Sequence, residues 1–373
     1  MESFIVRNLY TNNIETELER IGFDSGYKSV ASNKFQYKTF KIYDLTPAQA
    51  NILKQTALSV GADCATHRDV VTGKIQKSDA ILGGSYSQIK KIAEKLKSQP
   101  FLLKNLAENL LSKLTPTQRK TKLVGILNVT PDSFSDGGMY INPNDAIEHA
   151  YKLIDDGADV LDIGAESTRP YSKAVPFEEQ IARLKPVLEG LKDVKVPISI
   201  DTRSSFVAKF GLENGASIIN DVSGMSYDPK IADVVAANGA TLILQHTNGT
   251  PEDMQDSPSY NDVVEEVFFN LINKIECAKY RGVENIIIDV GIGFGKTKEH
   301  NYELLDRIEE FLSFNLPIMV GLSRKSLLGI KNNDNELKDA LSIAVSYPLI
   351  KKGVDYLRVH NVKLHKQLIN SAM

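Results

Sequence analysis

The stretch Gly125-Ile-Leu-Asn-Val-Thr-Pro-Asp-Ser-Phe-Ser-Asp-Gly-Gly138 joins a short apolar run to a polar, loop-forming segment. The apolar residues 123–127 predict a strand. Thr130-Pro-Asp132 and Asp136-Gly-Gly138 are typical of turns, because proline fixes φ and glycine permits positive φ. A simple connection rarely holds an amide, a threonine, two carboxylates and two serines within ten residues. We interpret the stretch as a strand and a functional loop, although Thr-Pro-Asp alone is equally typical of a plain βα turn.

The chain after this stretch repeats one pattern, in which a short apolar run precedes an amphipathic segment of helical period. The apolar runs cover residues 123–127, 160–163, 198–200, 218–219, 241–244, 286–288, 317–320 and 356–359. Eight strand–helix units in about 250 residues are typical of a (β/α)8 barrel. A doubly wound open sheet is the alternative, but no G-x-G-x-x-G motif opens the segment after the first run. The sequence therefore predicts an α/β TIM barrel over residues 119–373.

Proline marks two of the expected helices. Asp228-Pro229 predicts a helix start, with aspartate as the N-cap and proline at the first helical position. Pro348 lies within the segment after the seventh run, and we expect it to kink or interrupt that helix because it lacks a backbone N–H.

Residues 1–118 are predicted to form a smaller α+β domain that precedes the barrel. Its expected strands cover residues 4–9, 37–42, 61–66 and 79–82, and its expected helices cover 46–60, 85–98 and 102–114. Two of these helices begin at capping boxes, Thr46-Pro-Ala-Gln49 and Ser85-Tyr-Ser-Gln88. No motif indicates a function for this domain. Our hypothesis is that it supports stability or assembly and takes no direct part in chemistry.

The charge and composition of the chain exclude several classes of protein. A net charge of −3 favours neither nucleic acid nor an anionic membrane as a partner. No apolar run reaches about 18 residues, and no basic segment followed by a long apolar one opens the chain, so we expect neither membrane insertion nor secretion. Cys64 and Cys277 lie far apart, which favours a reducing, cytoplasmic setting. We expect a cytoplasmic protein that binds small molecules through local groups.

Each of the eight apolar runs ends in polar residues. In chain order these are Asn128, Glu166, Asp201, Asn220-Asp221, Gln245-His246, Asp289, Ser323-Arg324-Lys325, and Arg358 with His360. Any one of them could be an ordinary helix cap. In a barrel, however, the carboxyl ends of all strands meet at one mouth, where the active site lies. Eight polar ends in register therefore predict one shared site.

The charges of these side chains indicate two kinds of ligand group. Asp201, Asn220 and Asp289, with Lys325 nearby, suit a flat heterocycle that carries ring N–H and amino donors beside a carbonyl acceptor. A plain capping role remains the alternative for Asp201, because Asp201-Thr-Arg-Ser also has cap chemistry. The cationic group suits a phosphate or diphosphate, and it consists of Thr168, Arg169, Arg358 and His360. Asn128 could hold a Mg²⁺ ion that also bridges such an anion, while no zinc-like histidine spacing occurs.

The opening stretch resembles the first signature of dihydropteroate synthases, and the resemblance extends over residues 120–365. The later motifs follow in family order, as Gly164-Ala-Glu-Ser-Thr-Arg-Pro170, Ser199-Ile-Asp-Thr202, Asn220-Asp-Val222, Asp289-Val-Gly-Ile-Gly-Phe-Gly-Lys296, Ser323-Arg-Lys-Ser326 and Arg358-Val-His360. The resemblance implies condensation of 6-hydroxymethyl-7,8-dihydropterin diphosphate with 4-aminobenzoate in folate biosynthesis. It also implies Mg²⁺ as cofactor, inhibition by sulfonamides, and a homodimer.

The resemblance assigns roles to individual residues. It implies Asn128 for magnesium; Asp201, Asn220, Asp289 and Lys325 for the pterin; Thr168, Arg169, Arg358 and His360 for the diphosphate; and Ser323, Arg324, Phe134 and Pro170 for the aminobenzoate. Asp201, Lys325, Arg358 and His360 are the expected catalytic residues. Five positions depart from the usual family pattern, namely Ala165, Gln245, Thr247, Val290 and Asn361. Two alternatives stay open: a pterin-binding methyltransferase and a non-catalytic pterin-binding paralogue.

Overall fold

The structure is a computed structural model that describes residues 6–7, 9, 13–114, 119–130, 142–167, 172, 174–250, 253–330 and 334–372. The chain forms two compact units, Met1–Thr117 and Gln118–Met373. Within the described ranges, no helix is both long and apolar enough to span a lipid bilayer.

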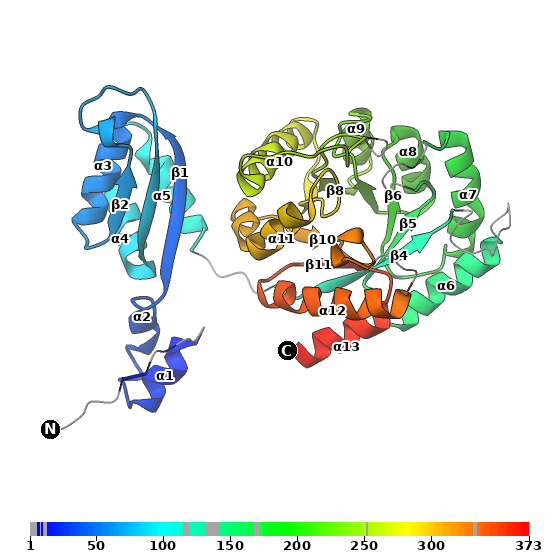
Figure 1. Cartoon of the computed structure of the whole chain (residues 1–373), viewed down its shortest axis with the longest axis horizontal. Helices are drawn as coiled ribbons and strands as arrows, with labels where there is room; N and C mark the ends of the chain where they lie inside the picture. The colour runs from blue at the N-terminus through cyan, green and yellow to red at the C-terminus, as the bar shows by residue number, and fades with distance from the viewer. Residues whose placement is uncertain are drawn as a thin grey trace. The chain divides into compact units, whose positions relative to one another are not determined.

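The N-terminal unit is built on an antiparallel sheet with the strand order β1-β3-β2 (Figure 1). Its elements are α1 (Ile14–Arg20), α2 (Lys28–Ser32), β1 (Tyr37–Leu45), α3 (Pro47–Leu58), β2 (Asp63–Thr66), η1 (Arg68–Val70), β3 (Ser78–Ser85), α4 (Tyr86–Leu96) and α5 (Leu103–Ser112). Apolar side chains from the sheet and from α3, α4 and α5 share one core, which contains Leu53, Leu82 and Ile92.

The capping boxes predicted at Thr46 and Ser85 are both present at the starts of α3 and α4. Half of the strand expected at residues 4–9 lies outside the described residues, and the other half, Val6, Arg7 and Leu9, has no regular structure. The short helices α1 and α2 have no counterpart in the sequence-based prediction.

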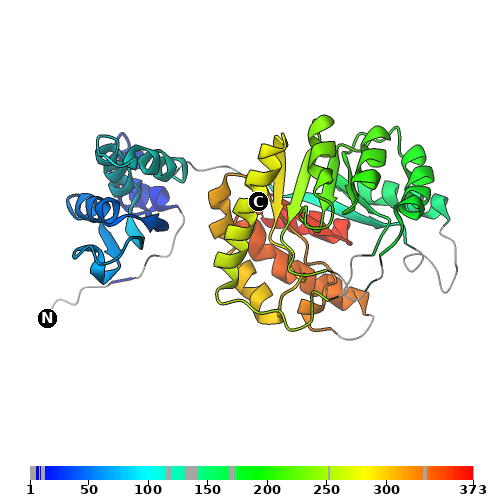
Figure 2. The same ribbon diagram turned by 90° about the horizontal axis from the view of Figure 1, so that it is seen from above.

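The second unit is a closed barrel of eight parallel strands, which confirms the predicted TIM barrel. The strand order is β10-β11-β4-β5-β6-β7-β8-β9, and the strands are β4 (Lys122–Asn128), β5 (Val160–Gly164), β6 (Ile198–Asp201), β7 (Ile218–Asp221), β8 (Thr241–Gln245), β9 (Asn285–Asp289), β10 (Ile318–Val320) and β11 (Tyr356–Val359). Figures 1 and 2 show the helices around the strands. These are α6 (Pro143–Asp155), α7 (Phe177–Gly190), α8 (Ser205–Glu213), α9 (Lys230–Ala237), α10 (Val263–Tyr280), α11 (Lys298–Asp306), η3 (Ile308–Phe314), η4 (Ser326–Leu328), α12 (Asn335–Lys351) and α13 (Val362–Ala372).

The interior of the barrel is apolar at one level and polar at the next. Side chains from six strands form a separate buried cluster, which contains Val124, Val160, Ile218, Ile243, Ile287 and Met319. Successive side chains of a strand point to opposite faces, so the residue two positions beyond each of these faces the interior again. Val160 is thus followed by Asp162, and Ile218 by Asn220. The apolar cluster forms a floor beneath the polar groups.

Proline shapes two helices differently from the prediction. The expected interruption of α12 at Pro348 is wrong, because the helix continues to Lys351. Pro348 lies in the last turn, so its missing N–H removes one backbone hydrogen bond to the preceding turn only shortly before the helix ends. The helix predicted to begin at Asp228-Pro229 starts one residue later, with Pro229 as the N-cap and the Asp228 carboxylate accepting from the Lys230 N–H (3.2 Å).

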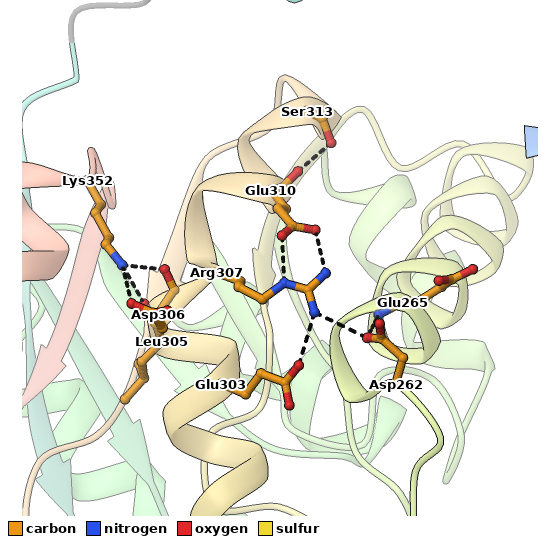
Figure 3. A network of polar contacts seen from close by, with 9 residues as sticks. All are labelled: Asp262, Glu265, Glu303, Leu305, Asp306, Arg307, Glu310, Ser313 and Lys352. Carbon is orange, nitrogen blue, oxygen red and sulfur yellow. Dashed lines mark hydrogen bonds and ion pairs between the residues drawn. The ribbon is translucent and has the colours of Figure 1, made fainter. Parts of the chain in front are cut away.

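A polar network ties α10, α11 and η3 together on the outside of the barrel (Figure 3). Arg307 lies 3.5 Å from the Asp262 carboxylate, 3.0 Å from that of Glu303 and 2.6 Å from that of Glu310. Lys352 donates to the carbonyl oxygens of Leu305 and Asp306. Half-exposed pairs of this kind contribute little individually, so the network mainly fixes how the helices join.

Candidate active site

Strands β5, β6, β7 and β11 bring two aspartates, one asparagine and one arginine together above the apolar floor. The Arg358 guanidinium donates through Nε to Asp162 Oδ2 and through Nη2 to Asp201 Oδ2, at 2.6 Å in each case. Asn220 Nδ2 donates to the same Asp162 oxygen at 3.1 Å. We call Asp162, Asp201, Asn220 and Arg358 the acidic layer. Arg358 therefore lies among the carboxylates here, although the sequence grouped it with the anion-binding residues.

The acidic layer has acceptor atoms without a hydrogen-bond partner among the residues that the structure describes. Within the described part of the chain, Asp162 Oδ1, Asp201 Oδ1 and Asn220 Oδ1 are buried without a hydrogen-bond partner, as is the Ser199 hydroxyl on β6. Leaving a buried polar atom unpaired costs free energy, so several in one place indicate a ligand site. The amide oxygen and the ionised carboxylate oxygens can only accept, so a ligand that presents several N–H or O–H donors fits them.

Burial dominates the electrostatics of these groups. It raises the pKa of Asp201, and the nearby Arg358 charge only partly opposes that rise. Burial alone would lower the pKa of Arg358, but the charges of Asp162 and Asp201 outweigh it and raise that pKa. Arg358 is therefore a permanent cation that makes the carboxylates tolerable at this depth.

Lys325 and Asp289 lie close to each other and to the acidic layer, since the charges of Asp289, Arg358 and Asp201 all act on Lys325. The Lys325 ammonium donates to the Ile292 carbonyl at 2.5 Å and lies 4.6 Å from the centre of the Phe294 ring. Burial lowers its pKa to about 8, although the charge of Asp289 works against that fall. Burial also raises the pKa of Asp289, whose Oδ1 accepts from the Gly291 N–H at 2.7 Å. The pair therefore offers a ligand one hydrogen-bond donor and one acceptor, and burial shifts the pKa of each group toward its neutral form.

The segment 290–296 supports that pair and contains a lysine to which the sequence assigned no role. Lys296 is buried, and its Nζ lies 2.9 Å from His246 Nδ1, 2.9 Å from the Gly291 carbonyl and 3.0 Å from that of Phe294. Gly291 has φ +70°, and a Cβ there would lie 1.8 Å from the His246 carbonyl oxygen. The backbone of this segment therefore requires glycine at residue 291, and Lys296 links the segment to the end of β8.

The residues after β10 and β11 contact each other. Ser323 Oγ accepts from the His360 N–H at 3.2 Å and lies 3.1 Å from His360 Nδ1. Arg324 instead turns to α12, where it donates to both oxygens of Asp339 at 2.8 Å. Ser323 and His360 thus contact each other, while the Arg324 guanidinium is already engaged by a carboxylate.

Asn128 ends β4 beside the acidic layer. A Cβ at Gly164 would lie 3.6 Å from Asn128 Oδ1 and 3.7 Å from Asp201 Oδ2, so glycine leaves room between these oxygens. No group of three His, Cys, Asp or Glu side chains suited to a metal occurs among the residues that the structure describes. One amide oxygen fits a Mg²⁺ ion only if substrate and water supply most of its ligands, which is a common arrangement for this ion.

Four candidate residues, Phe134, Thr168, Arg169 and Pro170, lie outside the described residues. The described flanks of the second motif are well anchored. Glu166 accepts two hydrogen bonds from Arg203, both at 3.1 Å, and one from the Val175 N–H at 2.9 Å.

Sequence reasoning missed three residues of this region, namely Asp162, Lys296 and Asp339. The signal for Asp162 was available in the sequence. A carboxylate inside the apolar run 160–163 is buried whether it faces the barrel interior or the helices, so it needs a partner. Lys296 ends a quoted motif, but its direction depends on the glycine-rich path before it. Asp339 lies on a helix and gave no signal.

The comparisons with known proteins agree with this geometry. Residues 124–360, more than half of the chain, match the family described as pterin binding enzyme. The chain belongs to the pterin-binding enzyme family. A bifunctional dihydropteroate synthase/dihydropteroate reductase from Helicobacter pylori is 35% identical over 372 residues, which cover 98% of this chain and 97% of that relative. The predicted resemblance to dihydropteroate synthases is confirmed.

Two further comparisons show what parts of this pterin-binding enzyme are shared. A probable bifunctional folylpolyglutamate synthase/dihydropteroate synthase from Haloferax volcanii is 35% identical over 352 residues, and the match spans 42% of its length and 87% of this chain. The structure of Xanthomonas albilineans dihydropteroate synthase with 4-aminobenzoic acid superimposes with a TM-score of 0.63 at 36% identity. That match covers 68% of this chain and 92% of the Xanthomonas chain.

Proposed function

We propose that this chain is a dihydropteroate synthase, which joins 4-aminobenzoate to 6-hydroxymethyl-7,8-dihydropterin diphosphate and releases pyrophosphate. The observation that carries the proposal is the set of unpaired buried acceptors on Asp162, Asp201 and Asn220. A dihydropterin has amino and ring N–H donors along one edge, which suit those acceptors. It also has a carbonyl oxygen that can accept from Lys325. Relatives named dihydropteroate synthase support the same reading.

The pterin would lie across the acidic layer, with Asp289 and Lys325 at its other side. Its donors would satisfy Asp201 and Asn220, and Lys325 would exchange the Ile292 carbonyl for the pterin. Hydrogen bonds to buried charged groups give strong selectivity, because a ligand without matching donors leaves those groups unpaired.

The reaction needs a good leaving group more than acid–base chemistry. The aminobenzoate nitrogen forms a bond to the pterin methylene carbon, the bond from that carbon to the diphosphate oxygen breaks, and its electron pair leaves with pyrophosphate. The amine then loses a proton to solvent. The electron-rich ring donates into the methylene group, and the carboxylates of Asp201 and Asp289 would favour the positive charge that develops there.

The diphosphate would meet His360, together with Thr168 and Arg169 of the second motif, while Arg358 adds positive charge from below. Asn128 would hold Mg²⁺ through its amide oxygen, and the ion when bound neutralises charge on the departing pyrophosphate. Ser323 and the second-motif Pro170 would contact the aminobenzoate, with Phe134 from the first loop. By resemblance the proposal also includes a cytoplasmic homodimer, which size-exclusion chromatography with light scattering would test.

Pyrophosphate release is the direct test of this function. The purified chain is mixed with both substrates and Mg²⁺, and pyrophosphate and dihydropteroate are quantified together. Equal amounts of the two products support the synthase. Tight pterin binding without product would identify a non-catalytic paralogue, and it would overturn the proposal.

We expect aryl sulfonamides with a free 4-amino group to compete with aminobenzoate, because they share its shape, its amine and its anionic end. Binding should be strong only when the pterin site already holds pterin or pyrophosphate with Mg²⁺, since those ligands supply one wall of the pocket. Isothermal calorimetry with and without pyrophosphate checks this order. Equally tight binding to the bare protein would contradict it.

Reduction of 7,8-dihydropteroate is a second candidate activity. The observation that favours it is the Helicobacter relative, whose match reaches over 98% of this chain and so includes most of the N-terminal unit. The Xanthomonas synthase, in contrast, covers 68% of the chain. Reduction would add a hydride and a proton across one ring C=N bond, so a hydride donor of the nicotinamide or reduced flavin class is required.

A chain that starts near Thr117 separates the two activities. We expect it to retain synthase turnover within about threefold of the full chain, since every proposed substrate contact lies in the barrel. We expect dihydropteroate reduction, assayed with NADH or NADPH and with or without flavin, only in the full chain. A loss of synthase turnover beyond about tenfold, with normal pterin binding, would assign the N-terminal unit a direct part in synthesis.

A further inference from the structure

Asp339 on α12 joins two loops that reach the site from neighbouring strands. Its carboxylate accepts from Arg324 Nε and Nη2 at 2.8 Å and from Asn361 Nδ2 at 3.0 Å. Arg324 follows β10, and Asn361 follows β11. Asp339 is 5% exposed, while the side chain of Arg324 is 31% exposed, so the carboxylate is buried and the contact is half-buried. We call these three residues the α12 clamp.

The clamp acts on a strained point of the backbone. Arg324 has φ +58°, in the left-handed region that residues with side chains rarely adopt. Its backbone N–H donates to Ser342 Oγ of the same helix at 3.3 Å. Such conformations persist only where the surroundings enforce them, and they concentrate at functional sites. Here α12 supplies the enforcing contacts to both the side chain and the backbone of Arg324.

The residues on either side of Arg324 are the ones that enter the site. Ser323 accepts from the His360 N–H, and Lys325 donates to the Ile292 carbonyl. A change in the φ angle of Arg324 would redirect both side chains. Asn361 directly follows His360, so the same carboxylate also restrains the partner of Ser323.

We propose that Asp339 is a positioning residue, which fixes Ser323 and His360 through the clamp and thereby shapes the end of the site that receives aminobenzoate. The proposal rests on the synthase function. The positioning role and simple electrostatics predict opposite changes in the affinity for aminobenzoate when Asp339 is replaced. Removing a carboxylate beside Arg324 would free a cation and strengthen binding of an anionic substrate, whereas loss of positioning weakens it.

The test compares Asp339→Asn with the double variant Asp339→Asn/Asn361→Asp, which returns a carboxylate to the other side of the same contact. We expect Asp339→Asn to raise the KM for aminobenzoate at least about tenfold, with the pterin KM within about threefold. We expect the double variant to recover to within about threefold of the wild type. An aminobenzoate KM that is unchanged or lower in Asp339→Asn, or a stable double variant without recovery, would overturn the proposal.

Asp355→Asn is the matched control, because Asp355 pairs with Arg119 and accepts from the Ile318 N–H at the opposite end of the barrel. It should reduce stability without changing either KM. Amide hydrogen exchange gives a readout independent of turnover. Exchange in residues 322–329 should increase in Asp339→Asn and not in Asp355→Asn, and equal exchange in the two variants would contradict the clamp. A wild-type chain that releases no pyrophosphate would instead refute the synthase function and leave the exchange result to decide the clamp.

Discussion

Replacing Lys325 with alanine, or Asp201 with asparagine, is expected to reduce synthase turnover below detection while the barrel stays folded. Lys325 provides a donor beside Asp289, and Asp201 provides an acceptor, Oδ1, that has no hydrogen-bond partner among the described residues. Losing one partner of a buried charged contact costs about 2–5 kcal/mol of binding. Steady-state kinetics, with circular dichroism as the check on folding, measures the effect. Wild-type-like kinetics in either variant would remove the pterin assignment.

A matched control and a pH series sharpen this prediction. Lys352→Ala removes a lysine that contacts Asp306 on the outside of the barrel, and it should leave the kinetics within about twofold of the wild type. Because the pKa of Lys325 is about 8, pterin affinity should fall as the pH rises through that value and the ammonium loses its proton. Lys325→Arg keeps its charge over this range, so its residual pterin affinity should fall less than that of the wild type. A fall of equal size in both proteins would place the titrating group elsewhere.

The barrel could be predicted because its signal is repetitive and local. Each strand is a short apolar run, and each run ends in a polar residue at the mouth, so Asp201, Asn220 and Asp289 could be placed from spacing alone. The order of chain elements then fixes which strands are neighbours. In the N-terminal unit, the two capping boxes gave equally local signals. The short helix α1 gave a weak one, because one buried leucine, Leu18, is too little for a periodic pattern.

The contacts within the site could not be predicted, because they depend on side-chain direction. Arg358 belongs to a strand-end motif, but only the barrel geometry shows that its guanidinium reaches across to β5 and β6. Arg324 likewise looks like a free cation in the sequence, and its positive φ and its partner Asp339 follow from how α12 packs. The same holds for Lys296, whose ammonium is enclosed by backbone carbonyls. Charge in a sequence therefore locates the site but does not say which charges are available to a ligand.

Arg358→Met is expected to destabilise the barrel strongly as well as to stop catalysis. The guanidinium is the partner of both Asp162 and Asp201, which are almost fully buried. Removing one partner from a buried ion pair typically costs about 3–5 kcal/mol, because the remaining charge is left uncompensated. We expect a fall in Tm of roughly 10 °C near neutral pH, measured by calorimetry.

The pH dependence of that loss follows from the carboxylates. Burial raises the folded-state pKa of Asp201 above its ordinary value of 3.8, and Arg358 is the largest influence that holds it down. Without the arginine that pKa rises further. A carboxyl group with a raised folded-state pKa contributes stability that is complete below its unfolded pKa and is lost as the pH rises through its folded pKa. The difference in Tm between Arg358→Met and the wild type should therefore be largest near pH 8. It should narrow toward pH 5, as the Asp201 carboxyl group becomes protonated in both proteins.

Arg358→Met/Asp201→Asn tests the cause directly, since it removes the arginine and one of the two charges that the arginine compensates. We expect this double variant to be more stable than Arg358→Met alone near neutral pH, with a coupling between the two sites of about 1–3 kcal/mol. Additive losses, or a Tm difference that widens toward acid pH, would mean that Arg358 stabilises the barrel by packing and not by compensating buried charge. Because the same carboxylates are proposed to hold the pterin, the result also measures how much stability the fold gives up to keep an acidic layer at the bottom of its site.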